Sequence, residues 1–192
     1  MARVRLIERD HAPPEVEELF QRIEANGAKI INLYRAIALT PPMISSFLKL
    51  GNCLLNKAEL SPKLRELAIL RIAKLCGSEY EWTQHVPIAR EVGVSQQQID
   101  DVHQWEDSVY FNDEERAVLQ YTDEVTRSVK AADETFEALR KHLSERSIVE
   151  LTMSIGYWGM IARVLVPLEI EIEEQSVGSA RDLLGKGSGP GF

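Results

Sequence analysis

The chain has 192 residues, of which 44% are hydrophobic and 27% charged, proportions typical of a soluble globular domain. Its formal net charge of −8 argues against nucleic-acid binding, because phosphate recognition needs a basic surface and no run of lysines and arginines supplies one. The first ten residues lack the apolar stretch that a secretory signal peptide requires. We therefore expect a cytoplasmic protein with no nucleic-acid partner.

Helical signals follow one another along most of the chain. Apolar residues recur at three- and four-residue intervals, and no strand-like alternation of polar and apolar residues is sustained. This pattern predicts an all-α fold. We expect the helices over residues 15–24, 28–39, 43–58, 60–77, 78–93, 94–105, 112–129 and 133–143, with a long apolar helix beginning near residue 144.

Prolines, glycines and small polar residues mark the ends of these helices. Pro41-Pro42 is expected to stop the second helix, since proline cannot continue one. Gly77 is expected to end the fourth helix, so that the Gly77-Ser78 turn folds it back against the fifth as a helical hairpin. Serines precede several helices at positions where a hydroxyl can cap the first turn, and the predicted N-caps are Ser61, Ser78 and Ser95.

The apolar segment over residues 151–168 has about the minimum length for a membrane span. It also contains Arg163, and a charge near a bilayer centre is costly. A central helix of a soluble bundle is the better interpretation, so no membrane association is expected. We predict a single domain over residues 1–175, with its motif region at about 40–130, and a flexible Gly/Ser-rich tail over 176–192.

Arg163 needs a partner within its apolar helix. The partner could be a substrate carboxylate, or a glutamate of the core or of a neighbouring subunit. The structural pairing with a glutamate is the one that we predict.

The segment "GSEYEWTQH", residues 77–85, carries a candidate reaction site. Glu81 and His85 are four residues apart and so share a helix face. The predicted hairpin brings Glu66, one of the few charges of the preceding apolar helix, back towards His85. A carboxylate beside an imidazole fixes its tautomer and makes a pair able to transfer a proton near neutral pH. The alternative is a capped helix start whose Glu81 and His85 make only a structural contact.

The run from Leu60 to Ile99, "LSPKLRELAILRIAKLCGSEYEWTQHVPIAREVGVSQQQI", resembles the carboxymuconolactone decarboxylase family, which includes the AhpD alkylhydroperoxidases. In the peroxidase branch the pattern is E-x11-C-x2-C-x3-H. At the same spacing this chain has Glu66, Ser78, Glu81 and His85, so the glutamate and the histidine are kept and both cysteines are replaced. The resemblance implies an AhpD-like helical bundle built of helical hairpins, assembled as a homo-oligomer, often a trimer or a hexamer.

The replaced cysteines bear on the chemistry. The peroxidase mechanism that the resemblance implies needs one thiolate to attack the hydroperoxide and a second thiol to resolve the product. Ser78 and Glu81 can do neither. The two cysteines of the chain, Cys53 and Cys76, do not form a C-x-x-C pair and are expected to be core residues, although a relocated role for Cys76 stays open.

The decarboxylase branch implies a different reaction, on a small carboxylated lactone and without a cofactor. Loss of carbon dioxide leaves an enolate-like charge that must be stabilised and then protonated. We expect His85 to transfer the proton, Glu66 to orient it, and Glu81 to be a second acid/base group. The substrate-binding candidates are Ser78, Tyr80 and Trp82.

A metal site is not expected, although Glu66, Glu81 and His85 could supply three ligands, because their spacing is not that of a di-iron bundle. Three functions remain open. The leading hypothesis is a cofactor-free acid/base enzyme on a small organic acid or lactone. The second is a thiol-dependent hydroperoxidase that uses Cys76, and the third is a non-catalytic binding protein on the same fold.

Overall fold

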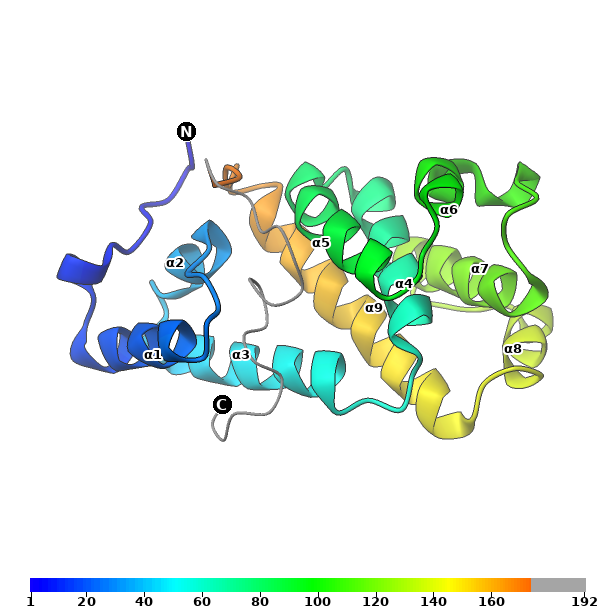
Figure 1. The fold of residues 1–192 in the computed structure, drawn as a ribbon, viewed down its shortest axis with the longest axis horizontal. Coiled ribbons are helices and arrows are strands. Elements are labelled where there is room, and N and C mark those ends of the chain that lie inside the picture. The colour runs from blue at the N-terminus through cyan, green and yellow to red at the C-terminus, as the bar shows by residue number, and fades with distance from the viewer. Residues whose placement is uncertain (174–192) are drawn as a thin grey trace. The chain divides into compact units, whose positions relative to one another are not determined.

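The structure, a computed structural model, describes residues 1–173, and every regular element in that range is a helix (Figure 1). The predicted all-α fold is therefore confirmed. The tail predicted over 176–192 lies outside the described residues. In chain order the elements are η1 Arg9–His11, α1 Pro14–Ala25, α2 Asn32–Ile37, α3 Pro41–Asn56, α4 Pro62–Cys76, α5 Glu79–Glu91, α6 Gln96–Asp101, η2 Val102–Asp107, α7 Asp113–Ser128, α8 Asp133–Arg140 and α9 Glu145–Leu165.

The chain divides into two compact units. Of the described residues, one unit contains 1–57 and 164–173, and the other contains 58–163. The expectation of a single domain over residues 1–175 stays a prediction. In the first unit α1 packs on α3 through one apolar face, and the residues of α1 that this face buries are Val16, Leu19, Phe20 and Ile23.

The second unit is built around α4. Every residue of α4 from Leu64 to Ala73 is buried, as its broad apolar surface predicts. The helix packs against α5 on one side and α7 on another, and Figure 1 shows α4 and α5 as a hairpin. The buried charge of Arg71 is compensated by Asp123 of α7, whose two carboxylate oxygens accept hydrogen bonds from the guanidinium at 2.5 and 2.6 Å. That ion pair joins α4 to α7.

Several helix boundaries differ from the prediction. Pro41-Pro42 lies beyond the end of α2, as predicted, but it also forms the first turn of α3, where the missing N–H groups would have had no intrahelical partner. The helix expected over 94–105 is divided into α6 and the 3-10 helix η2. Ser61 precedes α4 as predicted, yet its side chain makes no capping hydrogen bond. The prediction for Ser95 is confirmed, because its hydroxyl and the side chain of Gln98 form a reciprocal capping box at the start of α6.

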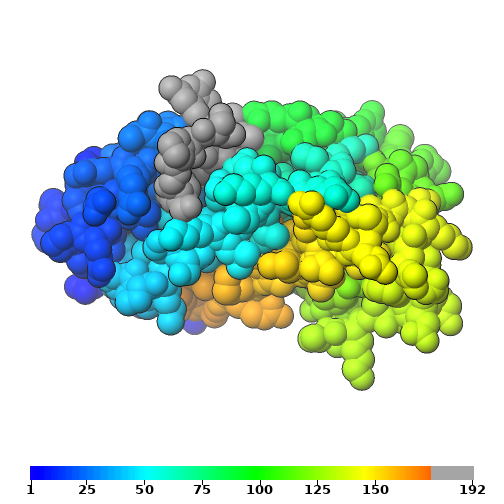
Figure 2. Space-filling view, turned by 90° about the horizontal axis from the view of Figure 1, so that it is seen from below, coloured from blue at the N-terminus to red at the C-terminus, as the bar shows by residue number. Residues whose placement is uncertain are grey.

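Helix α9 is a buried core helix of a soluble helical protein. It is the only helix among residues 1–173 long and apolar enough to cross a membrane, with a mean hydropathy of 1.3, but 56% of that window is buried in the fold. The remaining face reaches the surface, where α9 is coloured yellow to orange in Figure 2. The predicted pairing of Arg163 with a core glutamate is wrong within the described chain. Its guanidinium is exposed and donates to the carbonyl oxygen of Gly159 at 2.6 Å.

Candidate functional site

The turn between α4 and α5 brings the predicted site residues together. Gly77 ends α4 with φ at 64°, a left-handed conformation that glycine adopts without strain. The hydroxyl oxygen of Ser78 then caps α5 by accepting the backbone N–H of Glu81 at 3.4 Å, so the predicted cap is confirmed. The hairpin carries Glu66, on α4, back to the level of His85, on α5.

His85 is held at both ring nitrogens. Its Nδ1 lies 2.8 Å from Oε2 of Glu66, and the indole N–H of Trp158, on α9, donates to Nε2 at 3.0 Å. Because an indole nitrogen can only donate, Nε2 must accept, and Nδ1 carries the proton that is donated to Glu66. The imidazole is therefore neutral and its tautomer is set by its partners. All three side chains are buried.

Further contacts hold this cluster in place. Nε of Arg65 donates to Oε1 of Glu66 at 3.4 Å, so both oxygens of that carboxylate have partners. The rings of His85 and Trp158 meet edge to face, with centroids 5.8 Å apart and planes at 85°. Trp158 also packs edge to face on Tyr157. No local pattern in the sequence indicates that Trp158 contacts His85.

Glu81 differs from the other buried charges of the second unit. It is 2% exposed, and neither of its carboxyl oxygens has a hydrogen-bond partner among the residues that the structure describes. Burial raises the pKa of the Glu81 carboxyl from 4.5 to about 7, although the neighbouring Ser78 hydroxyl acts in the opposite direction. A carboxyl group of this kind exchanges a proton readily at neutral pH.

The three predicted substrate-binding residues lie in different surroundings. Ser78 and Tyr80 are buried beside the turn, whereas Trp82 is half-buried. The Nζ of Lys74 lies 3.6 Å from the centroid of the Trp82 ring, which makes a cation–π contact between the end of α4 and the first turn of α5. Trp82 therefore packs on the side of the α4–α5 hairpin and is not a core residue. The substrate contacts of all three stay predictions.

The cysteines occupy separate helices. Cys53 is exposed on α3, so the expectation of a core residue is wrong there, and Cys76 is half-buried in the last position of α4. Burial raises the pKa of the Cys76 thiol most; the charge of Glu81 raises it further and that of Arg163 lowers it. The Cys76 thiol is therefore poorly ionised at neutral pH.

Residues 1–173 contain no group of three or more histidine, cysteine, aspartate or glutamate side chains arranged to hold a metal ion. Glu81 makes no hydrogen bond to the Glu66–His85 pair.

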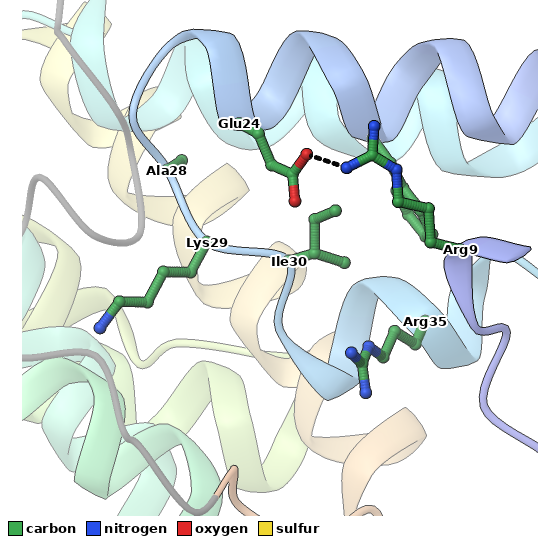
Figure 3. Close-up of a pocket in the computed structure, with 7 residues that line it drawn as sticks. Arg9, Glu24, Ala28, Lys29, Ile30 and Arg35 are labelled. Carbon is green, nitrogen blue, oxygen red and sulfur yellow. Dashed lines mark hydrogen bonds and ion pairs between the residues drawn. The ribbon is translucent and has the colours of Figure 1, made fainter.

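A cavity of about 350 Å³ lies in the first unit and holds several charged side chains (Figure 3). Arg9 lies between Glu17 and Glu24, with ion-pair distances of 3.0 and 2.7 Å, and Arg35 lies 3.3 Å from Glu8. Figure 3 shows Ile30 between the Arg9–Glu24 pair and Arg35. The arginines of this cavity are thus neutralised by glutamates of the same unit, and the cavity is not the candidate site.

Comparison with known proteins relates the middle of the chain to one family. Residues 41–124, from the start of α3 to within α7, match the model of the carboxymuconolactone decarboxylase family. The matched segment includes the whole α4–α5 hairpin, which carries Glu66 and His85. Among similar proteins, the uncharacterised protein YdfG of Bacillus subtilis is 26% identical over 112 residues, which cover 56% of this chain and 76% of YdfG.

Solved structures of AhpD-like and peroxidase-related proteins share the fold. A protein of unknown function from Agrobacterium tumefaciens, ascribed to AhpD-type antioxidant defence, is 28% identical with a TM-score of 0.68, over 72% of this chain and 96% of that one. A peroxidase-related protein from Silicibacter sp. TM1040 has a TM-score of 0.79 at 19% identity, over 93% and 95% of the two chains. The predicted AhpD-like bundle is confirmed.

Proposed function

We propose that this protein is a cytoplasmic, cofactor-free acid/base enzyme that transfers a proton to or from a small organic acid or lactone, with Glu81 as the transferring group. The observation that carries the proposal is the buried, unpartnered Glu81 carboxyl, whose pKa is raised to about 7. A general acid or base works best when its pKa lies near the operating pH, because both protonation states are then populated.

His85 has a positioning role in this proposal and does not carry the proton. Both of its ring nitrogens are already engaged, with Glu66 and with Trp158. To accept a second proton at Nε2 it would have to break the bond from the indole N–H and leave that donor without an acceptor. The Glu66–His85–Trp158 cluster is instead a rigid support one helical turn from Glu81.

The proposed chemistry balances without a cofactor. In a decarboxylation, the bond between the substrate carbon and its carboxylate breaks, carbon dioxide leaves, and the electron pair stays on the substrate as an enolate. The protonated Glu81 then donates its proton to that carbon. Ser78, buried and one turn away, is the candidate hydrogen-bond donor to the enolate oxygen.

A thiol-dependent hydroperoxidase remains the second candidate, supported by the half-buried Cys76 close to Glu81 and by the peroxidase-related structures of the same fold. It ranks lower because the raised pKa of the Cys76 thiol leaves little thiolate to attack a peroxide. The other cysteine of the chain, Cys53, lies on α3, so Cys76 has no C-x-x-C partner to act as the resolving thiol.

The proton-transfer proposal can be tested before the substrate is identified. Wild-type protein is incubated in D₂O with a panel of lactones, β-keto acids and 2-oxo acids, and ¹H NMR follows the loss of each α-proton signal. We expect accelerated exchange with at least one compound, and a rate about 100-fold lower in Glu81→Gln. The Cys76→Ser variant should retain the wild-type rate.

Three results would count against the proposal. Equal exchange rates in wild type and Glu81→Gln would remove Glu81 from the reaction. Consumption of an organic hydroperoxide with a dithiol reductant, lost in Cys76→Ser, would establish the thiol alternative. Exchange no faster than the uncatalysed rate for every compound, with no hydroperoxide consumption, would favour a non-catalytic binding protein.

A further inference from the structure

The first unit contains a cavity of about 350 Å³ whose lining comes from that unit alone (Figure 3). Its walls are formed by η1, α1, the loop between α1 and α2, and α2. The volume lies near the lower end of the range typical of small-molecule sites. The cavity shares no residue with the cluster around His85 and Glu81, so a ligand bound in it would be distinct from the substrate of the proposed function.

Part of this lining is apolar. Phe20 of α1 and Ala28 of the loop are buried, and Ile30 of the same loop is half-buried. None of the three side chains carries a polar atom, so they can pack on a hydrocarbon group but cannot form a hydrogen bond with a ligand. Small-molecule sites commonly combine such a surface with a few polar groups that orient the ligand. A ligand of this cavity therefore needs an apolar body.

Arg35 adds hydrogen-bond donors to the lining that residues 1–173 leave unused. Its side-chain contact in that range joins Nη1 to Oε1 of Glu8 at 3.3 Å. The two side chains are 34% and 53% exposed, so this ion pair contributes little to stability. Nε and Nη2 have no hydrogen-bond partner in the described chain. These adjacent N–H groups lie parallel, which is the geometry in which arginine binds both oxygens of a carboxylate.

The other charges of the cavity determine which anion fits. Arg9 is already held by two carboxylates, at 3.0 Å from Glu17 and 2.7 Å from Glu24. The side chain of Lys29 points away from that group in Figure 3. Glu24 keeps a carboxylate in the lining, and it repels a ligand with two negative charges more strongly than a ligand with one. The net charge of −8 adds to this effect.

We propose that this cavity binds a small monocarboxylate with a hydrocarbon body. Nε and Nη2 of Arg35 donate to the two carboxylate oxygens, and the body packs on Phe20 and Ile30. The contact of Arg35 with Glu8 persists, because it uses the third nitrogen of the guanidinium. Binding involves no covalent step, and the site does not depend on the function proposed for Glu81.

Isovalerate is a suitable probe, and isovaleramide is its uncharged counterpart of nearly the same shape. Titrations followed by saturation-transfer difference NMR give the Kd of each compound for the full chain. We expect wild type to bind isovalerate about tenfold more tightly than isovaleramide, because only the carboxylate forms charge-assisted hydrogen bonds with a guanidinium. Inorganic phosphate, added as a competitor, should not displace isovalerate.

Three variants locate the site. Arg35→Gln should weaken isovalerate binding about tenfold. Arg22→Gln is the matched control, because it removes the same charge from an exposed position of α1 outside the lining and should keep the wild-type Kd. Ala28→Leu leaves every charge in place but fills part of the cavity, so it should weaken isovalerate and isovaleramide alike. Circular dichroism verifies that each variant is folded.

Equal Kd values of wild type and Arg35→Gln for isovalerate would overturn the proposal, as would displacement by phosphate or the absence of binding to wild type. Wild-type affinity in a folded Ala28→Leu would place the ligand outside the cavity and overturn it too. The outcome is separable from that of the proposed function, because Glu81→Gln should bind isovalerate like wild type even though it stops proton exchange.

Discussion

At the scale of single residues, Glu81 makes folding depend on pH in an unusual direction. Its carboxyl has a pKa of about 7 in the folded protein, against 4.5 as the ordinary value. Between these values the unfolded chain loses the proton while the folded chain keeps it, so the Glu81 contribution to stability falls as the pH rises through that window. Below it both states are protonated, and above it the penalty is constant.

We therefore expect Glu81→Gln to change the pH profile of stability. The difference in free energy of unfolding between variant and wild type should grow from near zero at pH 4.5 to about 3 kcal/mol in favour of the variant above pH 7. Urea denaturation at several pH values measures it. Glu79→Gln is the control, because that neighbouring carboxylate is exposed and its profile should follow wild type. A constant difference across the pH range would show that Glu81 titrates normally.

The indole N–H of Trp158 supports a second prediction at this scale. Trp158→Phe removes the donor to His85 and leaves Nε2 of a buried imidazole without a partner, at a cost of about 1–3 kcal/mol beyond the lost ring volume. Trp105 is the matched control. It is also buried, but its indole nitrogen has no hydrogen-bond partner among residues 1–173, so Trp105→Phe removes ring volume without a hydrogen bond to that part of the chain.

Chemical denaturation followed by circular dichroism compares the two tryptophan variants. Trp158→Phe should be the more destabilised of the pair. Equal losses would mean that the Trp158–His85 bond contributes nothing to the folded state.

The limits of prediction from sequence are clear at these residues. Glu66 and His85 are 19 positions apart, and one hairpin turn, signalled by Gly77, is enough to bring them together. Trp158 is 73 positions from His85 on a helix with no local signal of contact. The burial of Glu81 also depends on packing between helices. Acidic residues are favoured in the first turn of any helix, so the position of Glu81 did not indicate that its carboxyl would be buried without a partner.

At the scale of helices, a boundary is predicted correctly where its local sequence signal is strong and has only one interpretation. The capping box of Ser95 has both of its members within four residues, so it forms where the sequence predicts it. Pro41-Pro42 is ambiguous, because proline both terminates a preceding helix and begins a following one. Here it begins α3.

The end of α7 gives a prediction about stability. Val129 follows this helix with φ at 60°, a left-handed conformation that costs a β-branched residue about 1–2 kcal/mol. Val129→Gly removes that strain, and part of the gain is offset by the greater freedom of glycine in the unfolded chain. We expect a net stabilisation of about 0.5–1 kcal/mol, seen as a rise of roughly 1–4 °C in Tm.

Val109 provides the control for this substitution. Both valines are 86% exposed, but Val109 is not among the residues with positive φ. Val109→Gly should lower the Tm slightly, because glycine increases only the entropy of the unfolded chain. A lower Tm for Val129→Gly as well would show that the left-handed conformation stores no strain.

At the scale of the whole molecule, the exposed face of α9 is a candidate contact between copies of the chain. Val149, Met153 and Met160 are each about half exposed, and Gly156 lies between the methionines. Their spacing of four, three and four residues places them on one face of the helix, opposite the side that carries Trp158. The guanidinium of Arg163 turns away from this stripe towards Gly159. Exposed apolar faces of this kind are commonly covered by another protein surface.

We propose that the stripe joins copies of the chain into a homo-oligomer, a trimer or a hexamer, with the α9 helices in contact. Met153→Lys combined with Met160→Lys would bury two unpaired charges in that contact, so the oligomer should dissociate. Light scattering after size-exclusion chromatography measures the mass. Met43→Lys, at an exposed methionine of α3, adds charge elsewhere and should leave the mass unchanged. A wild-type monomer, or a double variant of wild-type mass, would exclude α9 as the contact.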